Sequence, residues 1–129
     1  MRDKLYTGTT MDVLIVVSNR HLGALWSRHL ERIGATVSLA NSQEDAVHVL
    51  QESAKDVIIL ELTLEDGAAL AVSDFASYRR PEAKVIFISN GRFFSDGSIF
   101  HHCANACAVV PSATRPEDLA ALAEHHATH

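Results

Sequence analysis

The feature that most constrains the fold of this chain is a regular alternation between two apolar patterns. Short runs of branched aliphatic residues recur along the sequence, and the segments between them carry apolar residues at helical spacing. Runs of this kind are typical of strands buried on both faces of a parallel sheet, and the helices between them act as crossovers. The predicted strands are Asp12–Val17, Thr36–Ala40, Asp56–Leu60, Lys84–Ser89 and Ala106–Val110.

Capping signals indicate where the helices begin and end. Gly34 follows the first helical segment as a C-cap candidate, and Ser42 precedes the second as an N-cap, with Asp45 three residues on. Pro116 suits the first position of the last helix. The predicted helices are Asn19–Ile33, with Trp26 on its apolar stripe, Ser42–Ser53, Ala68–Tyr78 and Glu117–His126, while Gly91–Asn105 is predicted as a loop with a short, irregular helix.

This order predicts an α/β flavodoxin-like (βα)5 fold, a doubly wound parallel five-stranded sheet with strand order 2-1-3-4-5. The chain length fits one domain at residues 11–129, after a flexible leader at residues 1–10. Ligands of such folds bind at the carboxyl ends of the strands. The residues that follow the predicted strands are therefore the first candidates for function: Val17–Ser18–Asn19, Glu61 at the start of a loop, Ser89–Asn90 and Val110–Pro111.

Composition excludes several classes of protein. The chain has 11 Lys and Arg against 16 Asp and Glu, a net charge of −5, which argues against binding to nucleic acid. The longest apolar run, Val13–Val17, is too short to cross a membrane, and residues 1–10 lack the apolar core of a secretory signal. Two cysteines cannot make a disulfide framework. We expect a cytoplasmic protein with no membrane association.

Four segments resemble the receiver domain of two-component response regulators. The most specific is DVIILELTLEDGAAL at residues 56–70, which is similar to the stretch around the receiver phosphoacceptor, usually an aspartate. LIVVSN stands where the family has LIVDD, and VIFISN where it has a strand that ends in Thr or Ser. CANACAVVP matches the pattern Gly-Ala-x-x-Tyr-x-x-Lys-Pro. The resemblance covers residues 12–126 and implies the same doubly wound fold.

The departures from the receiver pattern fall on the residues that carry its chemistry. Val17 and Ser18 replace the acidic pair, Glu61 stands at the phosphoacceptor position, and Val110 replaces the lysine. Cys107 stands at the position of the switch aromatic. The switch hydroxyl, Ser89, is the one position in this set that keeps its family residue type.

These replacements predict a receiver that has lost its metal-dependent chemistry. Mg²⁺ prefers carboxylate oxygens, and phosphoryl transfer depends on metal and cationic charge. With the acidic pair and the lysine replaced, we expect no Mg²⁺ binding, no other cofactor and no metal site. Our hypothesis is that Glu61 instead accepts hydrogen bonds from Ser89, Ser18 or nearby backbone N–H groups, and so holds one conformation.

Two groups of side chains invite a metal or redox interpretation, but a structural role suits them better. Cys103 and Cys107 lie four residues apart beside His101 and His102, but no second ligand pair accompanies them. The C-terminal histidines suit the polar end of a helix. They are His125, His126 and His129.

Three phenylalanines are the candidate partner surface. Phe93, Phe94 and Phe100 follow the fourth strand in a segment with little periodicity, and they either contact a partner or pack as core. In receivers, the fourth helix, fifth strand and fifth helix form the usual output and dimer face. The resemblance therefore implies a protein partner, such as a histidine kinase or another regulator, or a homodimer through that face.

The leading prediction is a stand-alone atypical receiver, a pseudo-receiver, that acts in signalling by protein–protein contact and is not an enzyme. The first alternative is a receiver that a histidine kinase still phosphorylates, on Glu61 or elsewhere. The second is a small-ligand-binding module on the same fold. The segment after the first strand, SNRHLG, has too few glycines for a flavin phosphate loop and only approaches a cobalamin signature.

Overall fold

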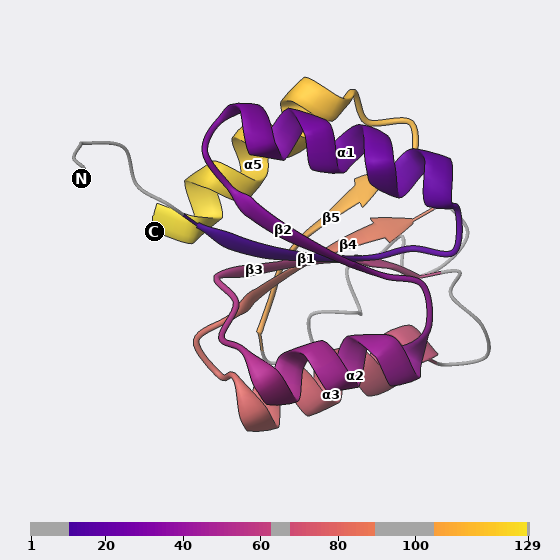
Figure 1. Ribbon diagram of the computed structural model, residues 1–129, viewed down its shortest axis with the longest axis vertical. Coiled ribbons are helices and arrows are strands. Elements are labelled where there is room, and N and C mark those ends of the chain that lie inside the picture. The colour runs from indigo at the N-terminus through magenta and orange to yellow at the C-terminus, as the bar shows by residue number, and fades with distance from the viewer. Residues whose placement is uncertain (1–10, 63–67, 90–104, 129) are drawn as a thin grey trace.

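Five parallel strands form one sheet in the order β2-β1-β3-β4-β5, which confirms the predicted topology (Figure 1). The computed structural model describes residues 11–62, 68–89 and 105–128. The strands are β1 (Asp12–Val16), β2 (Thr36–Ala40), β3 (Val57–Glu61), β4 (Lys84–Ser89) and β5 (Ala106–Pro111). The helices are α1 (Arg20–Arg32), α2 (Gln43–Glu52), α3 (Ala68–Arg79) and α5 (Pro116–Thr128). The predicted leader, residues 1–10, and residues 91–104 of the predicted irregular segment lie outside the described residues.

The helix ends are satisfied at Ser42 and Gly34, as the sequence predicts, and also at Asn19. Asn19 Oδ1 accepts a hydrogen bond from the Leu22 N–H at 3.1 Å, and Ser42 Oγ accepts one from the Asp45 N–H at 3.2 Å. At the end of α1, Gly34 has φ 97°, a left-handed conformation that glycine adopts without a steric penalty. The N–H groups of Gly34 and the next residue donate to the last carbonyls of the helix, so Gly34 ends α1 as predicted, although the C-cap residue itself is Ile33.

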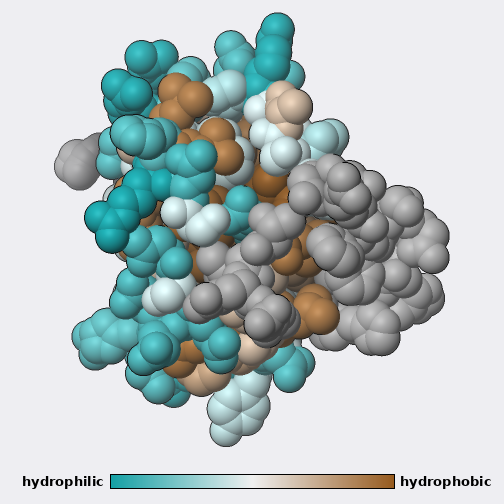
Figure 2. Space-filling model, turned by 90° about the vertical axis from the view of Figure 1, so that its right-hand side faces the viewer, coloured by the Kyte–Doolittle hydropathy of each residue, from teal (hydrophilic) through white to brown (hydrophobic). Residues whose placement is uncertain are grey.

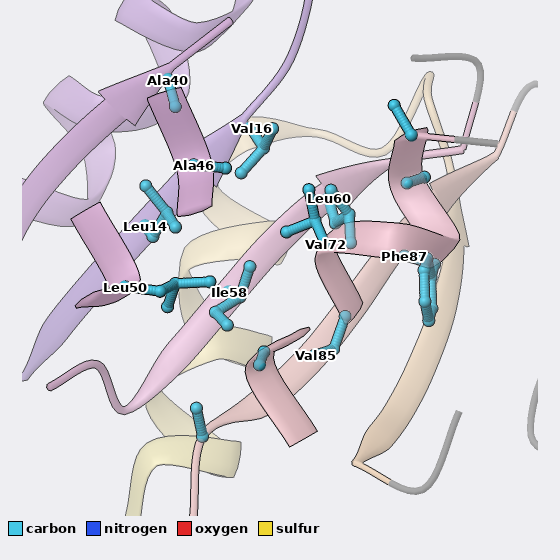
Figure 3. Packing of buried hydrophobic residues seen from close by; sticks show 14 residues of the cluster. Leu14, Val16, Ala40, Ala46, Leu50, Ile58, Leu60, Val72, Val85 and Phe87 are labelled. Carbon is cyan, nitrogen blue, oxygen red and sulfur yellow. The ribbon is translucent and has the colours of Figure 1, made fainter. Parts of the chain in front are cut away.

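Helices cover both faces of the sheet, and each face has its own apolar core. Figure 1 shows α1 and α5 on one face and α2 and α3 on the other. Successive strand residues alternate between the two, so Ile58 packs toward α2 and α3 while Ile59 packs toward α1 and α5, where the predicted core residue Trp26 also lies. Figure 3 shows the α2–α3 core, in which Leu14, Ile58 and Phe87 are fully buried.

The third strand is one residue displaced from its prediction. It runs from Val57 to Glu61, and Glu61 pairs in register with Ile88 of β4. The prediction that Glu61 begins a loop is therefore wrong. Because the backbone of Glu61 belongs to the sheet, its side chain leaves from a fixed position at the end of the strand.

The fifth strand contains a β-bulge at Cys107. Val85 of β4 pairs with Ala106, and the next residue of β4, Ile86, pairs with Ala108, so Cys107 is the extra residue. Both Cys107 and Ala108 pack toward α1 and α5, whereas Val109 packs toward α2 and α3. The bulge therefore places two consecutive side chains on the same face of the sheet, and the alternation between the faces resumes after it.

Two arginines at the end of α3 form hydrogen bonds with the end of α2. Arg80 Nε donates to the Leu50 carbonyl at 2.9 Å, and Arg79 Nη2 donates to the Gln51 carbonyl at 3.2 Å. Carbonyls in the last turn of a helix have no partner within the helix, and a cation there also suits the helix dipole.

No helix in the described part of the chain is both long and apolar enough to cross a bilayer.

Candidate functional site

The candidate site lies at the carboxyl ends of the strands, where the turns after β1 and β3 come together. Figure 2 views the molecule from this end and shows hydrophobic side chains between hydrophilic ones. Ser18 follows β1, and Glu61 is the last residue of β3, which pairs with β1. Two positions that are far apart in sequence are therefore neighbours across one strand pair.

The side chain of Glu61 is held by Ser18. Its Oε1 accepts a hydrogen bond from the Ser18 backbone N–H at 2.9 Å and a second one from the Ser18 hydroxyl at 2.9 Å. The structure thus confirms two of the donors that the sequence analysis offered for Glu61. Hydrogen bonds to a charged acceptor are stronger than those between neutral groups, so this contact joins the turn after β1 to the end of β3.

The contact uses one oxygen of a half-buried carboxylate. Glu61 is partly exposed and Ser18 is exposed. In the described part of the chain, Oε2 of Glu61 has no hydrogen-bond partner. The site can therefore present a localised negative charge, fixed in position by two donors and open to solvent or to a partner on its other oxygen.

The residues at the acidic-pair positions point in different directions. Val17 is 2% exposed and packs into the α1–α5 core, whereas Ser18 turns toward Glu61. Neither supplies a carboxylate. Among the described residues, no group of three or more His, Cys, Asp or Glu side chains is placed to hold a metal ion. The donors here do not fit the carboxylate-rich set that Mg²⁺ prefers.

Ser89 lies beside this contact on the next strand. It is the last residue of β4, one residue beyond Ile88, the partner of Glu61, and it is 6% exposed. Its carbonyl accepts a hydrogen bond from the Ser112 N–H at 2.9 Å. Ser89 thus belongs to the same end of the sheet as Ser18 and Glu61, as the spacing of the strands predicts.

The two β5 positions lie apart from this contact. Val110 packs toward the α1–α5 core, opposite Ile88, and brings no charge. Cys107 lies in the bulge near the other end of the strand, and its Sγ donates to the Val85 carbonyl at 3.4 Å. Burial raises the pKa of the Cys107 thiol, and the nearby Lys84 ammonium only partly offsets this effect. A thiol with a raised pKa is a poor nucleophile near neutral pH.

Several predicted candidates lie outside the described part of the chain. Phe93, Phe94 and Phe100, the candidate partner surface, lie outside the described residues. The same is true of Asn90, His101, His102, Cys103 and His129. His125 and His126 lie in the last turn of α5, where their rings meet edge to face, as expected for the end of a helix.

A second group of polar side chains lies at this end of the sheet, and it is not among the candidates predicted from the sequence. Arg20, Asn41 and Asp45 line a pocket of about 350 Å³ between α1 and the end of β2. Asn41 directly follows β2, so the rule that selected the residues after the other strands also applies to it. This rule does not select Arg20 or Asp45, because in the sequence each is an ordinary charged residue in the first turn of a helix.

Comparison of the fold with solved structures gives a consistent result. A CheY-like response regulator receiver domain protein from Methanospirillum hungatei JF-1 has a TM-score of 0.83 and 18% identity, over 93% of this chain and 95% of that one. A response regulator from Thermotoga maritima has a TM-score of 0.80 and 20% identity, over 94% and 100%. One from Burkholderia pseudomallei, solved with a phosphorylated aspartic acid, has a TM-score of 0.78 and 17% identity, over 92% and 69%.

No family model matches the sequence, and no curated protein does so either. The likeness to these three proteins therefore concerns the fold. Five parallel strands in the order 2-1-3-4-5, with helices on both faces, are common to the CheY-like fold and to this chain.

Proposed function

We propose that this chain, whose fold is that of response regulator receiver domains, is a signalling module that acts by protein–protein contact without Mg²⁺-dependent aspartyl phosphorylation. The observation that carries the proposal is the pair of 2.9 Å hydrogen bonds from Ser18 to Glu61. A carboxylate that would accept a phosphoryl group is instead tied to the turn in which Val17 and Ser18 replace two acids. The module is cytoplasmic and has no catalytic activity of its own.

The electrostatics of the site favour this proposal over phosphorylation. A phosphoryl group on Glu61 would add negative charge next to an end of the sheet where Val17, Ser18 and Val110 bring no cation and no ligand for one. Each charge-assisted contact that a phosphoryl group lacks is worth about 1.5–3 kcal/mol. Glu61 with its two donors supplies a permanent negative charge at this position, and so one fixed signalling state.

A phosphorylation assay tests the proposal directly. The full chain is incubated with a small phosphodonor and Mg²⁺, and its intact mass is measured. The response regulator from Burkholderia pseudomallei is the positive control, because it has been solved with a phosphorylated aspartic acid. We expect a phosphoryl adduct on the control and none on this chain. An adduct that maps to Glu61 would contradict the proposal and favour the alternative function, a receiver that a histidine kinase phosphorylates.

A partner assay tests the second half of the proposal. The chain is used as bait in an extract of its native cell, and the partner we expect is a histidine kinase or another regulator. Glu61→Gln removes the fixed charge but keeps an acceptor for Ser18, and Glu52→Gln, an exposed acid at the end of α2, is the matched control. Capture should fall for Glu61→Gln and persist for the control. Light scattering on the purified chain tests the homodimer, the other partner predicted.

A further inference from the structure

The pocket beside α1 is separate from the Ser18–Glu61 contact. Its floor is apolar and consists of Val17, Gly23, Leu39 and Ala40, while its polar wall consists of Arg20, Asn41 and Asp45. Leu39 is 50% exposed although it is a large aliphatic residue, so apolar surface is open to solvent here. A pocket in which a few convergent polar groups lie beside apolar surface is a common form of small-molecule site.

The polar wall is a chain of hydrogen bonds with Asn41 at its centre. With the Asn41 amide oriented to satisfy both neighbours, its Oδ1 accepts from Arg20 Nη2 at 3.0 Å and from Arg20 Nε at 3.1 Å. Its Nδ2 donates to Asp45 Oδ2 at 3.0 Å. The neutral amide of Asn41 thus lies between the Arg20 guanidinium and the Asp45 carboxylate and holds both in position. These contacts use Arg20 Nε and Nη2 and Asp45 Oδ2, so Asn41 leaves Arg20 Nη1 and Asp45 Oδ1 as positions for a ligand.

The charges and the floor together select a class of ligand. An anion would be attracted by Arg20 but repelled by Asp45, and a cation would be attracted by Asp45 but repelled by Arg20. A ligand that carries both charges close together can bind to both side chains at once. Val17 and Leu39 pack closely on Gly23 of α1, because a Cβ there would lie 3.0 Å from Val17 Cγ2 and 3.3 Å from Leu39 Cδ2. The methyl groups of these two residues belong to the apolar part of the lining, which suits an aliphatic group.

We propose that this pocket binds a free aliphatic amino acid, with its carboxylate on Arg20, its ammonium on Asp45 and its side chain on Leu39 and Val17. The pocket lies at the carboxyl ends of β1 and β2, where doubly wound folds bind their ligands. The site does not depend on the function proposed for Glu61, which lies on the other side of β1.

Titration of the isotope-labelled full chain with L-leucine, followed by two-dimensional NMR, tests the proposal. We expect shifts that saturate with a Kd of about 1 mM or tighter and that map to the residues lining the pocket. Two analogues each lack one charge: 4-methylpentanoate lacks the ammonium, and 3-methylbutylamine lacks the carboxylate. Each should bind about tenfold more weakly or worse, because a lost charge-assisted hydrogen bond costs at least that much.

Matched variants separate the two charges from general effects on folding. Arg20→Gln and Asp45→Asn should each weaken leucine binding by about tenfold, whereas Arg28→Gln on the same helix and Glu44→Gln in the same turn should not. Glu61→Gln should bind leucine normally, which separates this proposal from the preceding one. The proposal is wrong if leucine causes no saturable shifts, if the shifts map elsewhere, or if the one-charge analogues bind as well as leucine does.

Discussion

At the scale of single residues, the central contact of the candidate site joins the carboxylate of Glu61 to Ser18. Glu61 reaches from the end of β3 to the turn after the neighbouring strand β1 and accepts two hydrogen bonds from Ser18. An aspartate has one methylene fewer, so the same strand position would give a shorter reach. The longer side chain of Glu61 and the serine at position 18 act together, because an aspartate at position 18 would repel Glu61, whereas the serine donates to it.

A double-mutant cycle measures the strength of this contact. Ser18→Ala, Glu61→Ala and the double variant are compared by urea unfolding of the full chain. We expect a coupling free energy of about 1 kcal/mol, because the hydroxyl contact is charge-assisted but partly exposed to solvent. The Ser18 backbone N–H remains in every variant, so the cycle reports the hydroxyl alone. Strictly additive effects would show that this hydrogen bond does not form in solution.

The thiol of Cys107 should react slowly near neutral pH. Burial raises its pKa in the folded protein, so the folded state favours the neutral thiol. The resulting contribution to the free energy of unfolding is fully present below the pKa of this thiol in the unfolded chain. It is lost as the pH rises through the higher pKa of the folded protein. In a Cys103→Ser background, alkylation of the folded chain should reach half its maximal rate at a higher pH than alkylation in urea. Coincident profiles would contradict this expectation.

Single residues of the site could be predicted where the strand pattern alone fixes their place. Ser18, Glu61 and Ser89 follow apolar runs whose ends meet at one end of the sheet, and the structure places them there. The choice of Ser18 as the donor to Glu61 could not be made in advance, because it depends on side-chain direction. The network of Arg20, Asn41 and Asp45 depends on tertiary contacts between two helix starts, which leave no periodic signal.

At the scale of elements, a residue outside both helices adds a hydrogen bond between α2 and the end of α3. Arg80 follows α3 and donates to the Leu50 carbonyl in the last turn of α2. Arg80→Met keeps an unbranched apolar stem but removes the donors, so we expect a loss of about 1 kcal/mol in the free energy of unfolding. Urea denaturation measures it.

The neighbouring arginine supplies the control for this prediction. Arg79 also donates to a carbonyl at the end of α2, but Arg79 is exposed, whereas Arg80 is half-buried. Arg79→Met should therefore cost less than Arg80→Met. Equal losses would show that the two contacts contribute alike and that the burial of Arg80 is unimportant.

Most element bounds could be predicted, and the exceptions have physical causes. The caps at Asn19, Ser42 and Gly34 are local, because a side chain or a left-handed backbone satisfies the helix end by itself. The bounds of β3 differ by one residue, because pairing with β4 draws the polar Glu61 into the ladder. The bulge at Cys107 has no sequence signal of its own, since it arises from the register between two strands.

At the scale of the whole molecule, stability comes from two cores that share one sheet. Ile58 and Ile59 are adjacent in β3, and both are fully buried on opposite faces. Truncation of either residue to alanine should cost about 2–5 kcal/mol in the free energy of unfolding, because each opens a cavity in a packed core. Leu39→Ala is the matched control on β2, where the side chain is half-exposed and the loss should be below about 1.5 kcal/mol.

The comparison between Ile58 and Ile59 tests the architecture. A sheet covered on one face would lose stability from one of the two substitutions only. Similar losses from both, in one cooperative transition, are the expected result. The layered architecture is the part of the structure that the sequence predicts most fully. Continuous apolar runs indicate a sheet buried on both faces, and the order of strands and helices then restricts the sheet topology.

The bulge in β5 makes the two outer strands of the sheet unequal as templates for aggregation. An outer strand offers unpaired backbone groups to which another chain can add, and a bulge disrupts that template by twisting it. β5 carries such a bulge, whereas β2 keeps regular register with β1 at all five of its positions and exposes Leu39. If copies of this chain associate strand to strand under stress, β2 is where growth would begin, and a lysine in place of Leu39 would be the substitution that protects it.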